Sequence, residues 1–406
     1  MVPLCFVVGF LVLASHDWIA LIPWRKTRDA HWTERARVLF PFRKTHAVLM
    51  IYVPLMVAAG SRLIVETSLW ELLPRWLAAL AGAVLAGWFV VRAIFPEIVF
   101  RSWLYEIAIT CILRLGLWLV LIGAAFSMPE EFNLRTWLTL AGVITLQVAW
   151  PSLALWLLRG SGIVKPPNER LRKIVTECTR DGGPPVRSLW QVSGVTANAV
   201  ALPLTGTLLF HEKLMEILTD EEVATVCAHE LGHLAESGWI LLGRYLGAMA
   251  VLPMLLIKPA VHHWEFPGFI ALMLLVVFWS RLSSKLVNRM ERRADATATS
   301  QQSGEGIYAR ALEKLYQQNR MPAVMPGTTM SHPHLYDRML AAGVNPEYPR
   351  PAVPRKYSLV GWFIIFAGPL ALMGILSDGI GNGQRQHPEH PVDADHRPLG
   401  EQMPGR

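Results

Sequence analysis

The segment His229-Glu230-Leu231-Gly232-His233 brings two imidazoles and a carboxylate close together in the chain. On a helix, residues four apart project from the same face, so His229 and His233 can bind one zinc ion. Glu230, beside the first histidine, is placed to act as the general base on the attacking water. The same pattern also arises by chance on polar helix faces, so its context must decide between a site and a surface.

A catalytic zinc ion needs a third protein ligand and keeps its fourth position open. Glu291 is the best candidate, because it lies on a second predicted helix beyond an apolar run. Asp295, four residues further on the same face, can orient a ligating histidine through a hydrogen bond. The alternative is that both acids pair with arginines such as Arg292. We predict one zinc ion per chain, held by the two histidines of the motif and Glu291.

The helix that carries the motif begins with a capping box, in which Thr219 is followed three residues later by Glu222. It is predicted to run to about Ser237. Ahead of it, a helix at 168–178 and three short β-like runs bounded by Gly and Pro predict a small sheet. The strands are expected at 189–192, 199–202 and 207–210.

The composition is typical of a membrane protein, with 52% hydrophobic and 17% charged residues. Crossing a bilayer core takes roughly 20 helical residues, and eight apolar runs come close to that length. The net charge of +7 has no array of aromatics and lysines that would indicate a nucleic-acid partner. The predicted spans are 3–22, 47–65, 77–95, 104–126, 137–157, 238–257, 266–283 and 358–376.

The distribution of Lys and Arg predicts the orientation of these spans. The loop 23–45 carries seven such residues, whereas 127–135 carries only Arg135 and 258–265 only Lys258. We therefore expect the loop 23–45 and both polar segments around the metal motif on the cytoplasmic side of a bacterial inner membrane. The fold class is a mainly α-helical integral membrane protein with a small α+β zincin-type catalytic domain formed from two segments.

The predicted organisation alternates membrane and polar segments. It comprises a five-helix membrane region at 1–158, a first half of the peptidase domain at 159–237, two transmembrane helices at 238–283, a second half of the domain at 284–357, a last transmembrane helix at 358–376 and a disordered tail at 377–406. In or near the fourth predicted span, Glu106 and Arg114 indicate either a polar chamber or a snorkelling or interhelical pair.

At this point the sequence resembles the membrane peptidases that group HtpX with the CAAX prenyl endopeptidases. The resemblance lies in 198–201, the helix 223–234 with its His-Glu-Leu-Gly-His core, Glu291-x-x-x-Asp295 and the Ser-His-Pro at 331–333, and it covers about 165–345. Five spans before the motif and two between it and Glu291 look more like the arrangement of the CAAX peptidases. The last predicted span is not part of that pattern.

The resemblance implies a gluzincin, a zinc endopeptidase whose metal is held by two histidines and one glutamate. It implies that Glu230 is the base and proton shuttle, that the strand with Asn198 and Ala199 pairs with an extended peptide substrate, and that His332 helps to stabilise the oxyanion. For His332 a plain loop residue remains an alternative. Arg338 matches a basic position of the family, or binds a helix end or a carboxylate.

Protein or peptide substrates and the lipid bilayer are the expected partners. Two rival functions remain open: a membrane signalling protease of the antirepressor type, which would want a folded exterior sensor domain, and a non-enzymatic membrane scaffold with a vestigial metal site. The physiological substrate and the oligomeric state are not encoded in these motifs.

Overall fold

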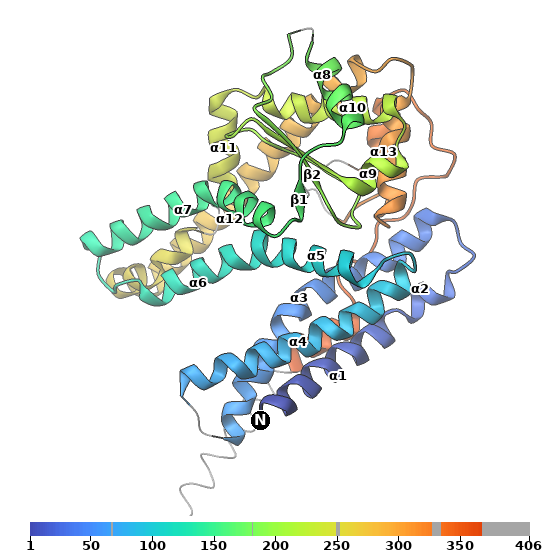
Figure 1. The fold of residues 1–406 in the computed structure, drawn as a ribbon. Coiled ribbons are helices and arrows are strands. Elements are labelled where there is room, and N and C mark those ends of the chain that lie inside the picture. Colours follow the sequence, from blue (N-terminus) through green and yellow to red (C-terminus); the bar gives the residue numbers. More distant parts are fainter. Residues whose placement is uncertain (66–67, 181, 249–251, 327–333, 368–406) are drawn as a thin grey trace, which may run out of the picture.

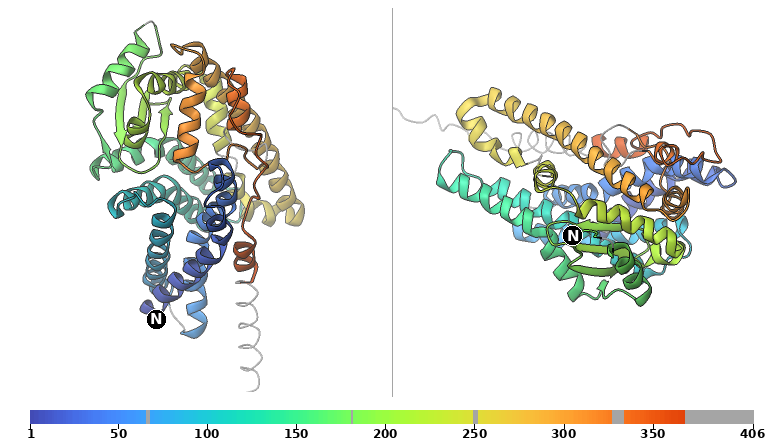
Figure 2. Two further views of the ribbon diagram at one scale, coloured as in Figure 1. Left: turned by 90° about the vertical axis from the view of Figure 1, so that its right-hand side faces the viewer. Right: turned by 90° about the horizontal axis from the view of Figure 1, so that it is seen from above.

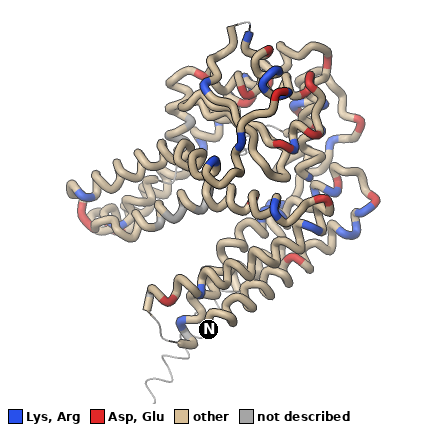
Figure 3. The backbone as a smooth tube through the Cα atoms, viewed as in Figure 1, with Lys and Arg blue, Asp and Glu red and all other residues tan. Residues whose placement is uncertain are grey.

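The structure is a computed structural model that describes residues 1–65, 68–180, 182–248, 252–326 and 334–367. It is mostly helical, with long helices below and a smaller domain above that contains a single sheet (Figure 1). The predicted tail at 377–406 lies outside the described residues, as does the second part, 368–376, of the predicted span at 358–376; within the described part, 359–367 is helical. Charged residues gather on the upper domain and at the end of the lower bundle where α2 leads into α3, whereas most of the lower bundle is uncharged (Figure 3).

Four N-terminal helices form the lower bundle: α1 (Val2–Ala20), α2 (Ile22–Lys26), α3 (Trp32–Ile64) and α4 (Leu69–Ile94). α1 and α4 pack closely because small residues face each other. A Cβ added to Gly82 would lie 2.2 Å from the carbonyl oxygen of Phe6, so only glycine permits this contact. The segment 23–45, expected as a loop, is largely helical, because α3 extends the second span back to Trp32.

A polar cluster ties this bundle together. One carboxylate oxygen of Asp17 lies 2.9 Å from the Nδ1 atoms of both His16 and His46. The other ring nitrogen of His16 lies 3.2 Å from Ser358 Oγ. These are hydrogen-bond distances, and they join α1, α3 and the segment that follows the upper domain.

The remaining long helices lie beneath and beside the sheet domain (Figure 2). They are α5 (Phe100–Thr110), a π-helical turn η1 (Cys111–Leu115), α6 (Gly116–Ser127), α7 (Leu134–Gly160), α11 (Gly238–Ala248), the 3₁₀ turn η2 (Leu252–Leu256) and α12 (Ile257–Ser300). α12 kinks at Glu265, which has a positive φ, and then continues without a break into the sheet domain.

Five helical stretches of the described chain are long and apolar enough to cross a membrane. They make the chain an integral membrane protein, but they do not confirm a count of eight spans. The predicted span 104–126 is divided by the π-helical turn, and 238–257 is divided between α11 and η2. The five candidates are Val2–Lys26, Trp32–Arg62, Trp70–Ile94, Leu134–Gly160 and Leu252–Ser300.

The sheet has four strands in the order β1-β2-β4-β3. β2 and β4 are parallel, while β1 pairs with β2 and β3 pairs with β4 in the antiparallel sense. The three predicted strands are present, with ends that differ by at most one residue, and β1 is a two-residue strand that the pattern did not reveal. The strands are β1 (Val164–Lys165), β2 (Ser188–Val192), β3 (Ala199–Leu202) and β4 (Thr207–His211).

Helices pack around this sheet and form the core of the upper domain. The core joins Phe210 and Leu208 of the sheet to Val223 and Leu231, and each of these side chains is at most 3% exposed. The order β1-β2-β4-β3 leaves β3 at an edge of the sheet. The helices are α8 (Glu169–Thr179), α9 (Glu212–Ile217), α10 (Asp220–Leu234), α13 (Ile307–Gln318) and α14 (Leu335–Ala341).

Candidate metal centre

The helix α10 presents the His-Glu-Leu-Gly-His motif, and its start is fixed as the sequence predicted. Glu222 N donates to Thr219 Oγ1 at 3.3 Å, and Thr219 N donates to a carboxylate oxygen of Glu222 at 3.0 Å. This reciprocal capping box satisfies two amides at the helix start. Lys314 of α13 also binds Glu222, so the cap is tied to a neighbouring helix. α10 ends at Leu234, three residues earlier than expected.

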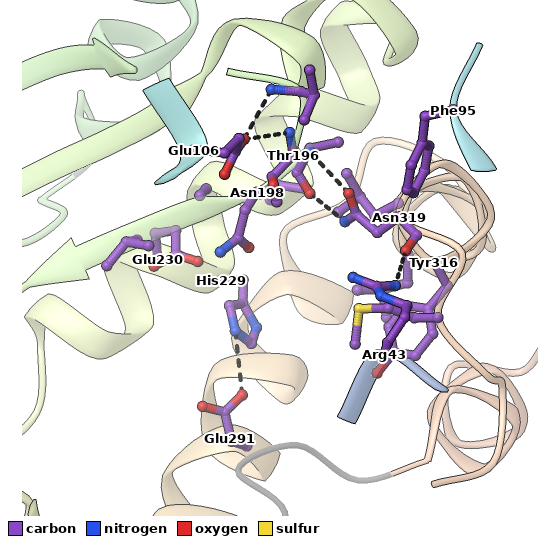
Figure 4. Close-up of a pocket in the computed structure, with 18 of the residues that line it drawn as sticks. Arg43, Phe95, Glu106, Thr196, Asn198, His229, Glu230, Glu291, Tyr316 and Asn319 are labelled. Atoms are coloured by element: carbon purple, nitrogen blue, oxygen red, sulfur yellow. Dashed lines mark hydrogen bonds and ion pairs between the residues drawn. The ribbon is translucent and has the colours of Figure 1, made fainter. Parts of the chain in front are cut away.

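Three predicted ligands meet between α10 and α12. His229 Nε2 lies 3.7 Å from one carboxylate oxygen of Glu291, and His233 Nε2 lies 3.5 Å from the other. One ligand atom from each residue falls within 4.8 Å of the others, and the three side chains are at most 8% exposed. Figure 4 shows the contact between His229 and Glu291 across the two helices.

A glycine lets the two helices approach closely enough for this. A Cβ added to Gly232 would lie 3.1 Å from the Cα of Ala294 on α12. Gly232 stands one residue before His233, and Ala294 three residues after Glu291. The backbone contact between α10 and α12 therefore sets the separation of the ligands.

A buried hydrogen-bond network holds His229 from behind. Its Nδ1 lies 2.8 Å from the Tyr308 hydroxyl and 3.2 Å from Asp295 Oδ1. The Tyr308 hydroxyl donates to Asp295 at 2.6 Å, and Arg338 donates to Asp295 through two nitrogens at 2.5 and 2.9 Å. With Nδ1–H donating to the phenol oxygen, the lone pair of His229 Nε2 faces Glu291, which is the tautomer that a metal ligand requires.

Tyr308 is the member of this network that sequence reasoning missed. It is 2% exposed, and burial raises the pKa of its phenol well above the ordinary value. The hydroxyl therefore stays protonated and remains a donor to Asp295. No motif marks Tyr308 in the sequence, because its place depends on how α13 packs against α10. Arg338 binds a carboxylate, that of Asp295, and also donates to the Tyr308 hydroxyl at 2.8 Å.

The electrostatic environment of His229 is balanced between burial and acidic neighbours. Burial favours the neutral imidazole, but the hydrogen bond to Asp295 and the charge of Glu230 outweigh it, so the pKa of His229 is raised. Glu230 itself is 7% exposed. It lies beside His229 on the wall of a cavity of about 1030 Å³.

This cavity lies between the sheet domain and the N-terminal helices. His229, His233, Glu230 and Glu291 line it from the domain side. From the other side it is lined by apolar residues of α4, among them Val90 and Ile94, and by charged residues such as Arg43 and Glu106. The edge strand β3 and the residues that precede it form a third wall (Figure 4).

Two further predicted site residues, Asn198 and Ala199, lie at the start of that edge. The carbonyl oxygen of Asn198 accepts a hydrogen bond from His211 N at 2.9 Å, which extends the β3–β4 pairing by one residue. Both residues line the cavity. The predicted oxyanion residue His332 lies outside the described residues.

The donor set suits a metal ion. Two imidazole nitrogens face one carboxylate at 3.5 and 3.7 Å, which is longer than a hydrogen bond. Ligands bound to zinc at about 2.0–2.2 Å in a tetrahedron stand roughly 3.3 Å apart. Two His and one Glu, backed by a hydrogen-bonded network, are thus spaced as ligands are spaced around an ion.

Comparisons with known proteins agree with this site. Residues 165–343 match the family model of Peptidase family M48. Over 231 residues the chain is 26% identical to Protease HtpX of Pseudomonas aeruginosa and to that of Pseudomonas paraeruginosa, a match that covers 47% of this chain and 79% of each relative. It is 31% identical over 99 residues to Protease HtpX of Legionella pneumophila, covering 24% of this chain and 35% of that relative. The matched segment 165–343 contains every residue of the donor set and its network.

Proposed function

Because this chain is a metalloprotease of peptidase family M48, we propose that it is a zinc-dependent endopeptidase of membrane-associated or extended protein substrates. The observation that carries this proposal is the convergence of His229, His233 and Glu291 at the wall of a large cavity. A protease also accounts for these residues better than a scaffold with a vestigial site would, since such a scaffold needs none of them.

The residues divide the work as follows. His229, His233 and Glu291 would hold one zinc ion, while Asp295 and Tyr308 keep His229 in its ligating tautomer. Bound there, zinc would supply Lewis acidity that polarises the scissile carbonyl and acidifies water.

Glu230 performs the proton transfer. Its carboxylate follows His229 directly in α10 and faces the same cavity. It takes a proton from the attacking water and returns it to the leaving amine, so that the peptide bond is hydrolysed.

The substrate is held by the sheet edge. β3 is the outer strand beside the site. An extended peptide adds to such an edge through main-chain hydrogen bonds, here from Ala199 onward, while Asn198 lines the cavity at the start of the edge. The apolar lining from α4, which includes Val90 and Ile94, favours chains that approach from the membrane. The seven Lys and Arg residues of 23–45 support a catalytic domain on the cytoplasmic side of an inner membrane, by the positive-inside rule.

The test is the Glu230→Gln variant, which removes the proton acceptor and keeps the three ligands. We expect it to retain about one zinc per chain and to lose nearly all cleavage of an extended peptide, about 10²-fold or more. Membrane-protein fragments that accumulate in active cells and not in Glu230→Gln cells would identify substrates. Cleavage by the variant above that of a metal-stripped control would show that Glu230 is not the base.

A further inference from the structure

The segment 194–197, which leads into the edge strand β3, is held by two sets of hydrogen bonds to side chains. Its residues 195–197 line the cavity along with β3. Its backbone groups do not pair with the rest of the sheet. They bind side chains from a membrane-region helix and from the end of α13 (Figure 4).

The first set of hydrogen bonds comes from Glu106 on α5. One oxygen of its carboxylate accepts hydrogen bonds from the backbone amides of both Val195 and Thr196, each at 2.9 Å. Hydrogen bonds to an ionised acceptor are about twice as strong as neutral ones. Gly194 leaves room for this approach, since a Cβ there would stand 2.6 Å from the same oxygen. The acid noted in the fourth predicted span thus binds backbone amides.

The second set of hydrogen bonds comes from Asn319, the residue directly after α13. Its amide oxygen accepts from Ala197 N at 2.9 Å, and its amide nitrogen donates to the Ala197 carbonyl at 2.7 Å. A neighbouring β-strand residue makes the same pair of bonds. Arg43 of α3 donates to the Asn319 carbonyl at 2.5 Å, which anchors the end of α13 to the membrane region.

The register of the sheet shows what this pairing does. Because His211 N donates to the Asn198 carbonyl, Asn198 faces β4, and the direction of the backbone groups alternates along an antiparallel strand. The amide and carbonyl groups of Ala197, Ala199 and Ala201 therefore point to the outer edge. Asn319 occupies this edge at Ala197, so main-chain pairing along the cavity begins at Ala199.

We propose that Glu106 and Asn319 are positioning residues for the peptide substrate: together they fix the start of the edge strand, and Asn319 stops substrate pairing at Ala199. This inference rests on the proposed peptidase function. Neither residue touches the reacting atoms. Their contribution is the position of β3 and the length of peptide that it accepts.

The first experiment compares two inhibitors on the full-length protein in detergent. Acetohydroxamate reaches only the metal, whereas a peptidyl hydroxamate also lies along the edge strand. Glu106→Ala should weaken the peptidyl hydroxamate about tenfold or more and leave acetohydroxamate affinity and zinc content unchanged. Glu106→Gln, whose amide oxygen can still accept both bonds, should restore most of that affinity. Glu97→Ala, which removes an exposed acid just before α5, is the matched control.

The outcomes distinguish failure of the positioning role from failure of the proposed function. If the parent binds neither inhibitor, the proposed metal site is wrong, and the positioning role that rests on it is wrong too. If the parent binds both and Glu106→Ala binds both as well as the parent does, only the positioning role of Glu106 is wrong. Equal weakening of both inhibitors would assign Glu106 a general structural role and would also refute the proposal.

The second experiment tests the stop at Ala199. Peptidyl hydroxamates are lengthened by two residues at either end, in two series. In the parent, the affinity of one series should stop increasing with peptide length. In Asn319→Ala the affinity of the same series should increase further, about threefold or more, because Ala197 is released for pairing with the peptide. Gln317→Ala, an exposed side chain on the same helix, should behave as the parent. An unchanged plateau in Asn319→Ala would overturn the role of Asn319.

Discussion

The Tyr308→Phe variant tests the network behind His229 with the removal of one oxygen atom. In the folded protein this hydroxyl lies 2.8 Å from His229 Nδ1, 2.6 Å from Asp295 and 2.8 Å from Arg338. Phenylalanine fills the same space, so packing is kept. What is lost is the link that passes the orientation of the Asp295 carboxylate to the imidazole.

The magnitude follows from the bonds that remain. Arg338 keeps two bonds to Asp295, and His229 Nδ1 still lies 3.2 Å from the same carboxylate. Loss of an outer partner of a metal ligand costs 10–100-fold in metal affinity, and a remaining partner places this variant at the low end. We expect zinc affinity to fall about tenfold, or about 1.4 kcal/mol. The metal-free protein should lose about 1–2 kcal/mol of stability.

The assay is competition for zinc with a chromophoric chelator, together with unfolding of the metal-free protein. Tyr348→Phe is the matched control, because Tyr348 is also buried, and among the described residues its hydroxyl forms a hydrogen bond only to the Met339 sulfur, at 3.6 Å. The control should keep the parent's zinc affinity. If Tyr308→Phe also keeps it, the hydroxyl does not support His229. If the loss equals that of His229→Ala, the variant has disrupted the site itself.

Three further predictions concern the helices that position the site and the orientation of the chain in the membrane. Gly232→Ala places a Cβ 3.1 Å from the Ala294 Cα, so α10 and α12 must separate by a few tenths of an ångström; zinc affinity should fall, and an unchanged affinity in the same chelator assay would show that the contact does not set the ligand spacing. Thr219→Ala removes the capping hydroxyl of α10 and should lower the free energy of unfolding, measured by chemical denaturation, by about 1 kcal/mol. An unchanged free energy of unfolding would mean that Glu222 alone stabilises the start of the helix. Single cysteines at Thr176 and Ser303, in a background without the native ones, should resist an impermeant thiol reagent in intact cells, whereas one at Glu130 should label; the reverse pattern would invert the orientation, and labelling of only one of the first two would break the shared site.

The parts of the site that follow from local sequence could be predicted, and the parts that depend on packing could not. The motif, its capping box and three strands are visible because spacing and turn residues act over a few positions. Glu291 was found because zinc chemistry demands a third ligand. Tyr308 gives no such signal, since its hydroxyl matters only once α13 has packed against α10.

The membrane region shows the same division. Apolar runs reveal that spans exist, yet they do not reveal the π-helical turn within 104–126 or the extension of α3 back to Trp32. Glu106 was expected to mark a polar chamber, or to snorkel or form an interhelical pair, and it does line the large cavity. Its partners are the amides of Val195 and Thr196, and no pattern of side chains predicts a contact to backbone so distant in the chain.

Beyond its kink at Glu265, α12 continues as one helix from the apolar region to Glu291. The thickness of the bilayer therefore affects the position of this predicted metal ligand. Glu291 stands roughly 36 Å along the helix from Pro267, at 1.5 Å per residue, and the same helix crosses the apolar region. Hydrophobic mismatch changes the tilt of such helices, and a tilt of about 2° moves a point at that distance by about 1 Å. A displacement of that size is enough to lower the catalytic rate about 100-fold. Activity reconstituted in bilayers of graded acyl-chain length should therefore pass through an optimum, and a flat profile would show that the domain fixes Glu291 independently of the membrane.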